Sequence, residues 1–74
     1  MNASERMAQW LAEEGLTMSS LARKLNCTPS HVGHLIARRR KPSRRVANLI
    51  ERLSAQWPMG PIRSTEWDST EVAA

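Results

Sequence analysis

The sequence predicts an all-helical domain of four helices, or five, followed by an extended C-terminal tail. Proline and glycine are sparse before Trp57, and β-branched and aromatic residues are few, which disfavours strands. Apolar residues recur at helical spacing, and each apolar segment follows a residue that can cap a helix. With 74 residues, the chain is one small domain that can bury only about 60% of the surface it exposes when unfolded.

The first helix is expected to start after Asn2, which can cap it, and Glu5 three residues later completes a capping box. Gly15 can end this helix by adopting a left-handed backbone conformation. The residues expected on its inward face are Met7, Trp10 and Leu11. Those expected to face solvent are Arg6, Gln9, Glu13 and Glu14.

Residues 17–36 predict two short helices joined by a tight turn. Thr17 can cap the first, and Thr28 can cap the second, with Pro29 at the first helical position, where its missing N–H costs nothing. Asn26 suits the turn because asparagine is one of the few non-glycine residues that tolerate a left-handed backbone. The inward-facing residues of the pair are Leu21, Ala22, Leu25, Val32, Leu35 and Ile36.

Ser43 can cap a fourth helix, which Pro58 is expected to end. Apolar residues at positions i, i+4, i+7 and i+11 give this helix one buried face. They are Val46, Ile50, Leu53 and Trp57. We therefore expect the whole of residues 44–57 to be helical and to pack under the first three helices.

The net charge of +4 is distributed unevenly along the chain. Six of the eleven Lys and Arg residues lie within residues 38–45, whereas residues 60–74 carry Arg63 against three acidic residues. A run of like charges repels itself, so it is expected either as a solvating surface or opposite a polyanion. The members of this basic run are Arg38, Arg39, Arg40, Lys41, Arg44 and Arg45.

The two-helix segment also matches a known motif residue by residue. Ala22 is small at the point where the helices would cross, Asn26 takes a turn position usually held by glycine, and Cys27 is the small residue after it. Val32 and Leu35 take the two buried positions of the second helix. With these residues the segment resembles the helix-turn-helix of the lambda-repressor/Cro-like family of DNA-binding proteins.

The resemblance implies that the chain binds double-stranded DNA through the second helix of the motif, expected at residues 29–37. Bases would be contacted by Pro29, Ser30 and His34, from the first turn of this helix and from one turn further along. Contacts to the sugar-phosphate backbone would come from Thr17, Met18, Ser19, Thr28, His31, Arg38, Arg39, Arg40, Lys41 and Arg44.

The tail, residues 59–74, is too short for a separate domain, so residues 1–58 are expected to form the DNA-binding domain. Two interpretations of the tail stay open. It could be an arm that contacts a second copy in a homodimer, or it could be a disordered end. The residues assigned to the dimer contact are Trp57, Ile62 and Trp67.

Other classes of protein are disfavoured. No carboxylate lies near a histidine at a spacing that suits acid-base chemistry, and no glycine-rich phosphate loop is present, so we expect no enzyme, cofactor or small-molecule ligand. Cys27, His31 and His34 form C-x3-H-x2-H but lack a fourth zinc ligand, so we expect no metal site. Neither a secretion signal nor an apolar run of the roughly 20 residues that cross a membrane is found, which predicts a cytoplasmic protein with no membrane partner.

The sequence thus predicts a transcriptional regulator, a dimeric repressor of phage or mobile-element type that binds an inverted-repeat operator. The alternative is a protein-binding module with the same fold, such as an antitoxin or an inhibitor, which would bind DNA weakly and without sequence preference. RNA binding is disfavoured because exposed stacking aromatics are expected only in the tail.

Overall fold

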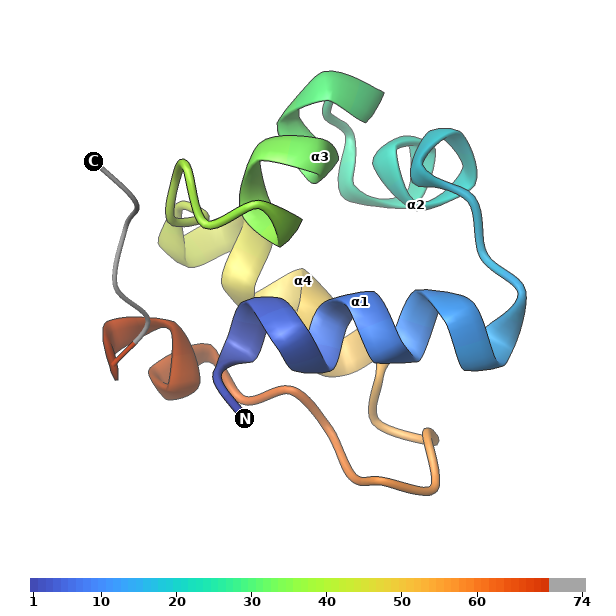
Figure 1. Cartoon of the computed structure of the whole chain (residues 1–74), viewed down its shortest axis with the longest axis vertical. Helices are drawn as coiled ribbons and strands as arrows, with labels where there is room; N and C mark the ends of the chain where they lie inside the picture. Colours follow the sequence, from blue (N-terminus) through green and yellow to red (C-terminus); the bar gives the residue numbers. More distant parts are fainter. Residues whose placement is uncertain (70–74) are drawn as a thin grey trace.

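The computed structural model describes residues 1–69. Over these residues it contains α1 (Ala3–Glu14), α2 (Met18–Leu25), α3 (Pro29–Ile36), α4 (Arg44–Leu53) and a short 3-10 helix, η1 (Ser64–Ser69). Figure 1 shows α2 and α3 side by side at one end of the molecule and the segment after α4 at the other. The predicted all-α class with four helices is confirmed. None of the helices within the described residues has both the length and the apolar character needed to cross a bilayer.

The helices begin where the sequence predicts, because the capping side chains are in place. The Asn2 side chain accepts the Glu5 N–H at 2.9 Å, and the Glu5 carboxylate accepts the Asn2 N–H at 3.3 Å, which completes the predicted capping box. Thr17 caps α2 in the same reciprocal way. Thr28 and Ser43 accept a backbone N–H from the first turns of α3 and α4.

Helices α1, α2 and α3 end in the same backbone reversal. A residue just after each helix is left-handed: Gly15 (φ 65°), Asn26 (φ 57°) and Arg38 (φ 61°). The next residue donates its N–H to a carbonyl near the helix end, at 2.9 Å in all three cases, as in a Schellman motif. The sequence predicts the reversals at Gly15 and Asn26. It does not predict the one at Arg38, because a left-handed non-glycine residue costs about 1–2 kcal/mol. Because the chain reverses at Arg38, α3 ends at Ile36, with Ala37 as its C-cap, one residue before the predicted end.

One apolar core joins all the helices. The predicted inward faces of the first three helices are buried, except that Ile36 is half-buried. The Ser4 hydroxyl is also buried and donates to the Leu35 carbonyl at 2.7 Å, which ties α1 to α3. The buried apolar residues are Ala3, Met7, Trp10, Leu11, Leu21, Ala22, Leu25, Val32, Leu35, Val46, Ala47, Ile50, Trp57, Ile62 and Trp67.

The prediction of a fourth helix that runs to Trp57 is wrong. α4 ends at Leu53, and this residue is 38% exposed although it was expected to be buried. The buried residues of α4 are Val46, Ala47 and Ile50. Trp57 is nevertheless buried, because the chain turns after α4 and brings its side chain to α1. There its indole N–H donates to the Glu13 carboxylate at 3.0 Å.

Ser54 explains why α4 ends early. Its hydroxyl is fully buried and donates to the Ile50 carbonyl at 2.7 Å, one helical turn earlier. The same oxygen accepts the N–H of Ile62 at 2.9 Å. A side chain that bonds to the helix backbone in this way competes with continuation of the helix. The bond from Ile62 then holds the returning chain against the end of α4.

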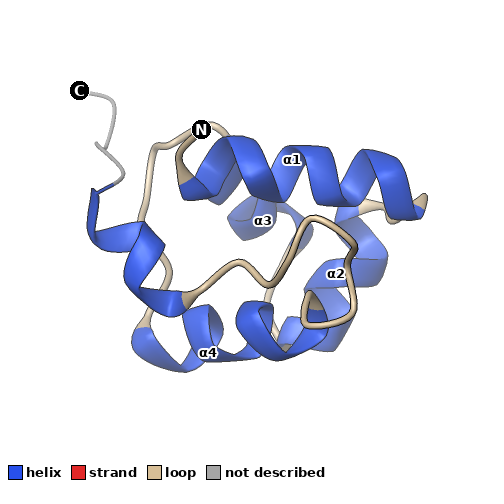
Figure 2. Cartoon of the chain, turned by 90° about the horizontal axis from the view of Figure 1, so that it is seen from below, coloured by secondary structure: helices blue, strands red, loops and turns tan. Residues whose placement is uncertain are grey.

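Residues 59–69 fold back onto the helices instead of extending away from them. Figure 2 shows the segment after α4 crossing between α1 and α4 before it forms η1. Ile62 is 0% exposed, and Trp57 and Trp67 are each 3% exposed. The assignment of these three side chains to a dimer contact is therefore corrected, because the core of the same chain covers them. The end of the predicted tail, residues 70–74, lies outside the described residues.

Candidate nucleic-acid interface

The turn between α2 and α3 fixes the angle at which α3 is presented. Asn26 has φ 57° and ψ 47°, and the N–H of Cys27 donates to the Ala22 carbonyl at 2.9 Å. Ala22 is 1% exposed and Val32 is 0% exposed, so the helix faces expected to pack are buried. With these faces buried, the opposite face of α3 is turned outward.

The three predicted base-contacting residues lie on the outward face of α3. Pro29 and Ser30 are exposed, and His34 is half-buried. Ser30 and His34 are four positions apart, so their side chains lie one above the other on a helix. Neither side chain makes a hydrogen bond with another residue in the described part of the chain. Their polar atoms therefore remain available to a ligand.

Met18, at the start of α2, borders this outward face. This residue is 45% exposed, and its sulfur would lie 3.6 Å from a Cβ atom added at Gly33. This separation is an ordinary van der Waals contact, so packing within the chain does not require a glycine at this position. The start of α2 and the middle of α3 thus contribute to one surface.

Four further residues predicted to contact the DNA backbone lie at the N-terminal ends of α2 and α3. Thr17 and Ser19 are exposed at the start of α2. At the start of α3, Thr28 is exposed and His31 is half-buried. The threonine hydroxyls accept backbone N–H groups as helix caps, but each still has its own hydrogen to donate. Helix N-termini also carry partial positive charge, which favours phosphate.

The basic run begins immediately after α3. Its members predicted to contact DNA are all exposed: Arg38, Arg39, Arg40, Lys41 and Arg44. Within residues 1–69 the only ion pair joins Arg6 to Glu66, so none of these cations is neutralised by a described carboxylate. Because α3 has eight residues, it is only about 12 Å long. Every residue of α3 therefore lies within about 12 Å of the end of the helix that the basic run follows.

Two members of the basic run also make contacts within the chain. Arg45 Nη1 donates to the Leu25 carbonyl at 3.5 Å, at the C-terminal end of α2, where a positive charge is also favoured by the helix dipole. Lys41 Nζ donates to the Asp68 carbonyl at 3.4 Å. Both distances are long for hydrogen bonds. Arg45 therefore contributes to the end of α2, whereas Arg44 makes no such contact in the described chain.

The residues of the C-x3-H-x2-H pattern do not form a metal-ligand cluster. Within residues 1–69, no three His, Cys, Asp or Glu side chains are grouped so that they could hold one ion. Cys27, His31 and His34 are therefore not grouped in this way either. Burial raises the pKa of the Cys27 thiol, and the nearby Arg45 guanidinium partly offsets this effect. The thiol is therefore protonated at neutral pH.

Arg6 is the residue whose role the sequence did not reveal. It was expected to face solvent, but it is half-buried and contacts Glu66 at 2.6 Å. The two residues are 60 positions apart, so no local pattern connects them. The only sign of this contact in the sequence was the excess of acidic over basic residues in the tail.

No family model, no curated protein and no solved structure matches the chain. The function of the interface is therefore inferred from its own residues, burial and charges.

Proposed function

We propose that the chain is a sequence-specific regulator of transcription that binds double-stranded DNA through α3. The observation that carries this proposal is the position of cations without an ion pair to residues 1–69 close after a helix whose outward polar side chains make no hydrogen bond to those residues. Direct base readout and phosphate attraction need these two features side by side.

The outward face of α3 suits the major groove. The groove is about 12 Å wide, and a helix with its side chains has a diameter of about 10–12 Å. Short side chains at the contact let the helix approach the base edges. Ser30 and His34 would hydrogen-bond to bases, and Pro29 would offer an apolar contact to a thymine methyl group.

The cations after α3 suit the phosphate strand that borders the groove. If five of them, Arg38, Arg39, Arg40, Lys41 and Arg44, each contact one phosphate, the slope of log affinity against log salt is about −4 to −5. These contacts would set position and orientation, and α3 would supply sequence discrimination.

The form of regulation that fits a small chain is repression by occupancy of an operator, as in regulators of phage and mobile elements. Two copies on an inverted repeat would place their α3 helices about 34 Å apart, one turn of DNA. Such a homodimer would use a surface other than the buried Trp57, Ile62 and Trp67. It would act in the cytoplasm, without a cofactor.

The proposal is tested by selecting preferred sites from a pool of random DNA duplexes and then measuring affinities by mobility shift. Ser30→Ala/His34→Ala is expected to lose discrimination between the selected site and random DNA, by about 1–3 kcal/mol per lost base contact. Arg39→Ala/Arg40→Ala is expected to weaken binding to all duplexes alike and to make the salt slope shallower by about 2.

Arg52→Ala provides the matched control, because Arg52 is an exposed cation at the opposite end of α4. It should change affinity much less than the loss of Arg39 or Arg40. If no sequence is enriched, and the two double variants bind DNA as the wild type does, the protein-binding alternative takes the place of this proposal.

A further inference from the structure

Residues 57–69, named here the C-terminal brace, are held to α1 by Arg6. Its Nη1 donates to both carboxylate oxygens of Glu66, at 2.7 and 2.6 Å. Its Nη2 donates to the carbonyls of Met59 and Gly60, at 3.0 and 3.1 Å. The side chains of the Arg6–Glu66 pair are only 19% and 28% exposed, so solvent screens the pair incompletely. A single guanidinium thus binds both the start and the helical part of the brace.

The brace is also attached to α4. The N–H of Ser64, the first residue of η1, donates to the Glu51 carboxylate at 2.8 Å. The N–H of Ile62 donates to the buried Ser54 hydroxyl at 2.9 Å. Together with the Arg6 contacts, these bonds fix η1 in one position on the domain.

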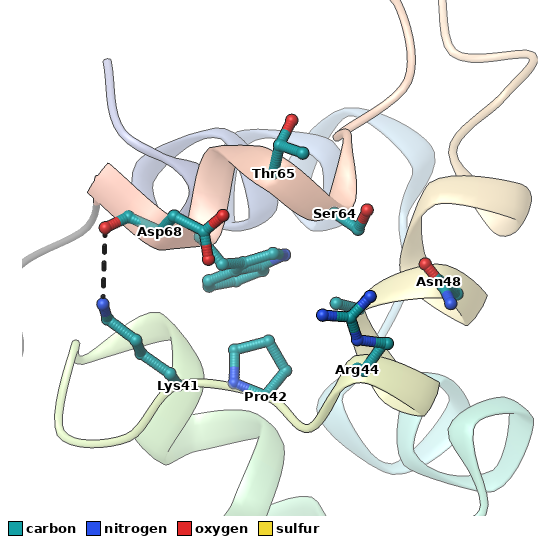
Figure 3. A pocket seen from close by; sticks show the side chains of 9 residues that line it. Lys41, Pro42, Arg44, Asn48, Ser64, Thr65 and Asp68 are labelled. Carbon is teal, nitrogen blue, oxygen red and sulfur yellow. Dashed lines mark hydrogen bonds between the residues drawn. The ribbon is translucent and has the colours of Figure 1, made fainter.

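The helical part of the brace faces the cations that follow α3. Trp67 is 3% exposed and, together with Pro42 and Arg44, lines a cleft of about 260 Å³ between η1 and the start of α4. Figure 3 shows Lys41 reaching Asp68 on one side of this cleft, through the 3.4 Å hydrogen bond to the Asp68 carbonyl, and Arg44 on the other side.

Residues 38–43, named here the basic loop, have few constraints of their own. The N–H groups of Arg38 and Arg39 bond back to α3, and Ser43 caps α4. Between these anchors, residues 40–42 make no hydrogen bond to another described residue except the one from Lys41 to η1. Like charges in the loop repel one another, and the bond from Lys41 to η1 is the one described hydrogen bond that opposes this repulsion in the middle of the loop.

We propose that the C-terminal brace positions the basic loop for phosphate binding, with Arg6 and Glu66 as the positioning residues. This inference rests on the proposed function, because it needs DNA as the ligand. Ordering long cationic side chains costs conformational entropy when a complex forms. A loop that is already held in place loses less entropy on binding, so docking of the brace increases DNA affinity without touching DNA.

The test uses two variants that break the same ion pair and change the net charge in opposite directions. Glu66→Gln removes a negative charge, and Arg6→Gln removes a positive one. If only the net charge of the protein mattered, Glu66→Gln would strengthen DNA binding and Arg6→Gln would weaken it. If the brace positions the basic loop, both variants should weaken DNA binding by about threefold to tenfold and make the salt slope shallower by about 1.

Glu14→Gln and Arg52→Gln are the matched controls, because they make the same charge changes at exposed positions outside the brace. Glu14→Gln should strengthen DNA binding and Arg52→Gln should weaken it, as the change in net charge predicts. The discrimination of Glu66→Gln between specific and random DNA should stay at the wild-type value, which separates a shifted loop from a damaged α3. Thermal unfolding establishes that each variant is folded at the temperature of the binding assay.

Amide chemical shifts in the free protein provide a second measurement, which needs no DNA. Glu66→Gln should shift the amides of Arg40 and Lys41 more than those of Ser30 and His34. Unchanged loop shifts, or a Glu66→Gln variant that binds DNA at least as tightly as the wild type, would overturn the inference. A wild-type chain that does not bind DNA would instead refute the proposed function, whatever the loop shifts show.

Discussion

Replacing Arg38 with glycine should stabilise the fold and, at the same time, weaken DNA binding. Arg38 has φ 61°, and its side chain makes no hydrogen bond or ion pair with the described residues. A non-glycine residue in this conformation costs about 1–2 kcal/mol. Glycine removes this cost but adds about 0.4–1 kcal/mol of unfolded-chain entropy. The net gain in the free energy of unfolding is therefore about 0–1.6 kcal/mol, with a midpoint of about 0.8 kcal/mol.

Urea and thermal unfolding measure this gain. For a domain of this size the midpoint corresponds to a rise in Tm of about 3–6 °C. Arg39→Gly is the control, because it removes the same charge at a neighbouring position whose φ is not positive. It should leave stability unchanged or lower it, since glycine there adds entropy without relieving strain.

Asn26→Gly extends the comparison to a second left-handed position. Asparagine tolerates this conformation better than arginine does, so the gain at Asn26 should be only a few tenths of a kcal/mol. For DNA binding, Arg38→Gly and Arg39→Gly should each make the salt slope shallower by about 1. Equal stabilities of the Arg38→Gly and Arg39→Gly variants would refute the strain that we assign to position 38.

Two further predictions concern stability alone. Ser54→Ala should lower the free energy of unfolding in urea by about 1–3 kcal/mol, because it leaves the buried N–H of Ile62 without its partner. The exposed Ser19→Ala should change it by less than about 0.5 kcal/mol, and a similar loss in both variants would contradict the role of Ser54. Burial raises the pKa of the Cys27 thiol above its value in the unfolded chain, so the folded state holds this proton more tightly. This contribution to stability is complete below the ordinary thiol pKa and is lost as the pH rises through the folded value. Urea titrations from neutral to alkaline pH should show a shallower decline for Cys27→Ala than for the wild type, and parallel declines would exclude the thiol as the cause.

Features that depend on a few neighbouring residues followed from the sequence. The caps at Asn2, Thr17, Thr28 and Ser43 are formed within a single helical turn, so their effect does not depend on the rest of the chain. The left-handed turn at Asn26 is likewise a local preference. The outward face of α3 and the run of cations after it could be located for the same reason, from helical spacing and from charge.

The position of the C-terminal segment depended on contacts that spacing cannot reveal. Trp57, Ile62 and Trp67 were assigned to a contact with a second copy, but the core of the same chain buries them. Hydrophobic burial has no direction, so the pattern did not say whether the same chain or a second copy would cover them. The packing of residues 57–69 across α1 and α4 decides this in favour of the same chain.

The sequence by itself determined the helices, their starts and the location of the charged surface, because these follow from interactions within one or two helical turns. Only the tertiary structure decided that α4 stops at Leu53, that Arg38 is left-handed, and that Arg6 binds Glu66 from 60 positions away. Two of these features involve groups that are separated in sequence, since Ile62 donates to Ser54 at the end of α4 and Glu66 binds Arg6. Local sequence preference disfavours an early end of α4 and a left-handed arginine, and it does not indicate the Arg6–Glu66 pair. These three features could therefore be found only in the packed structure.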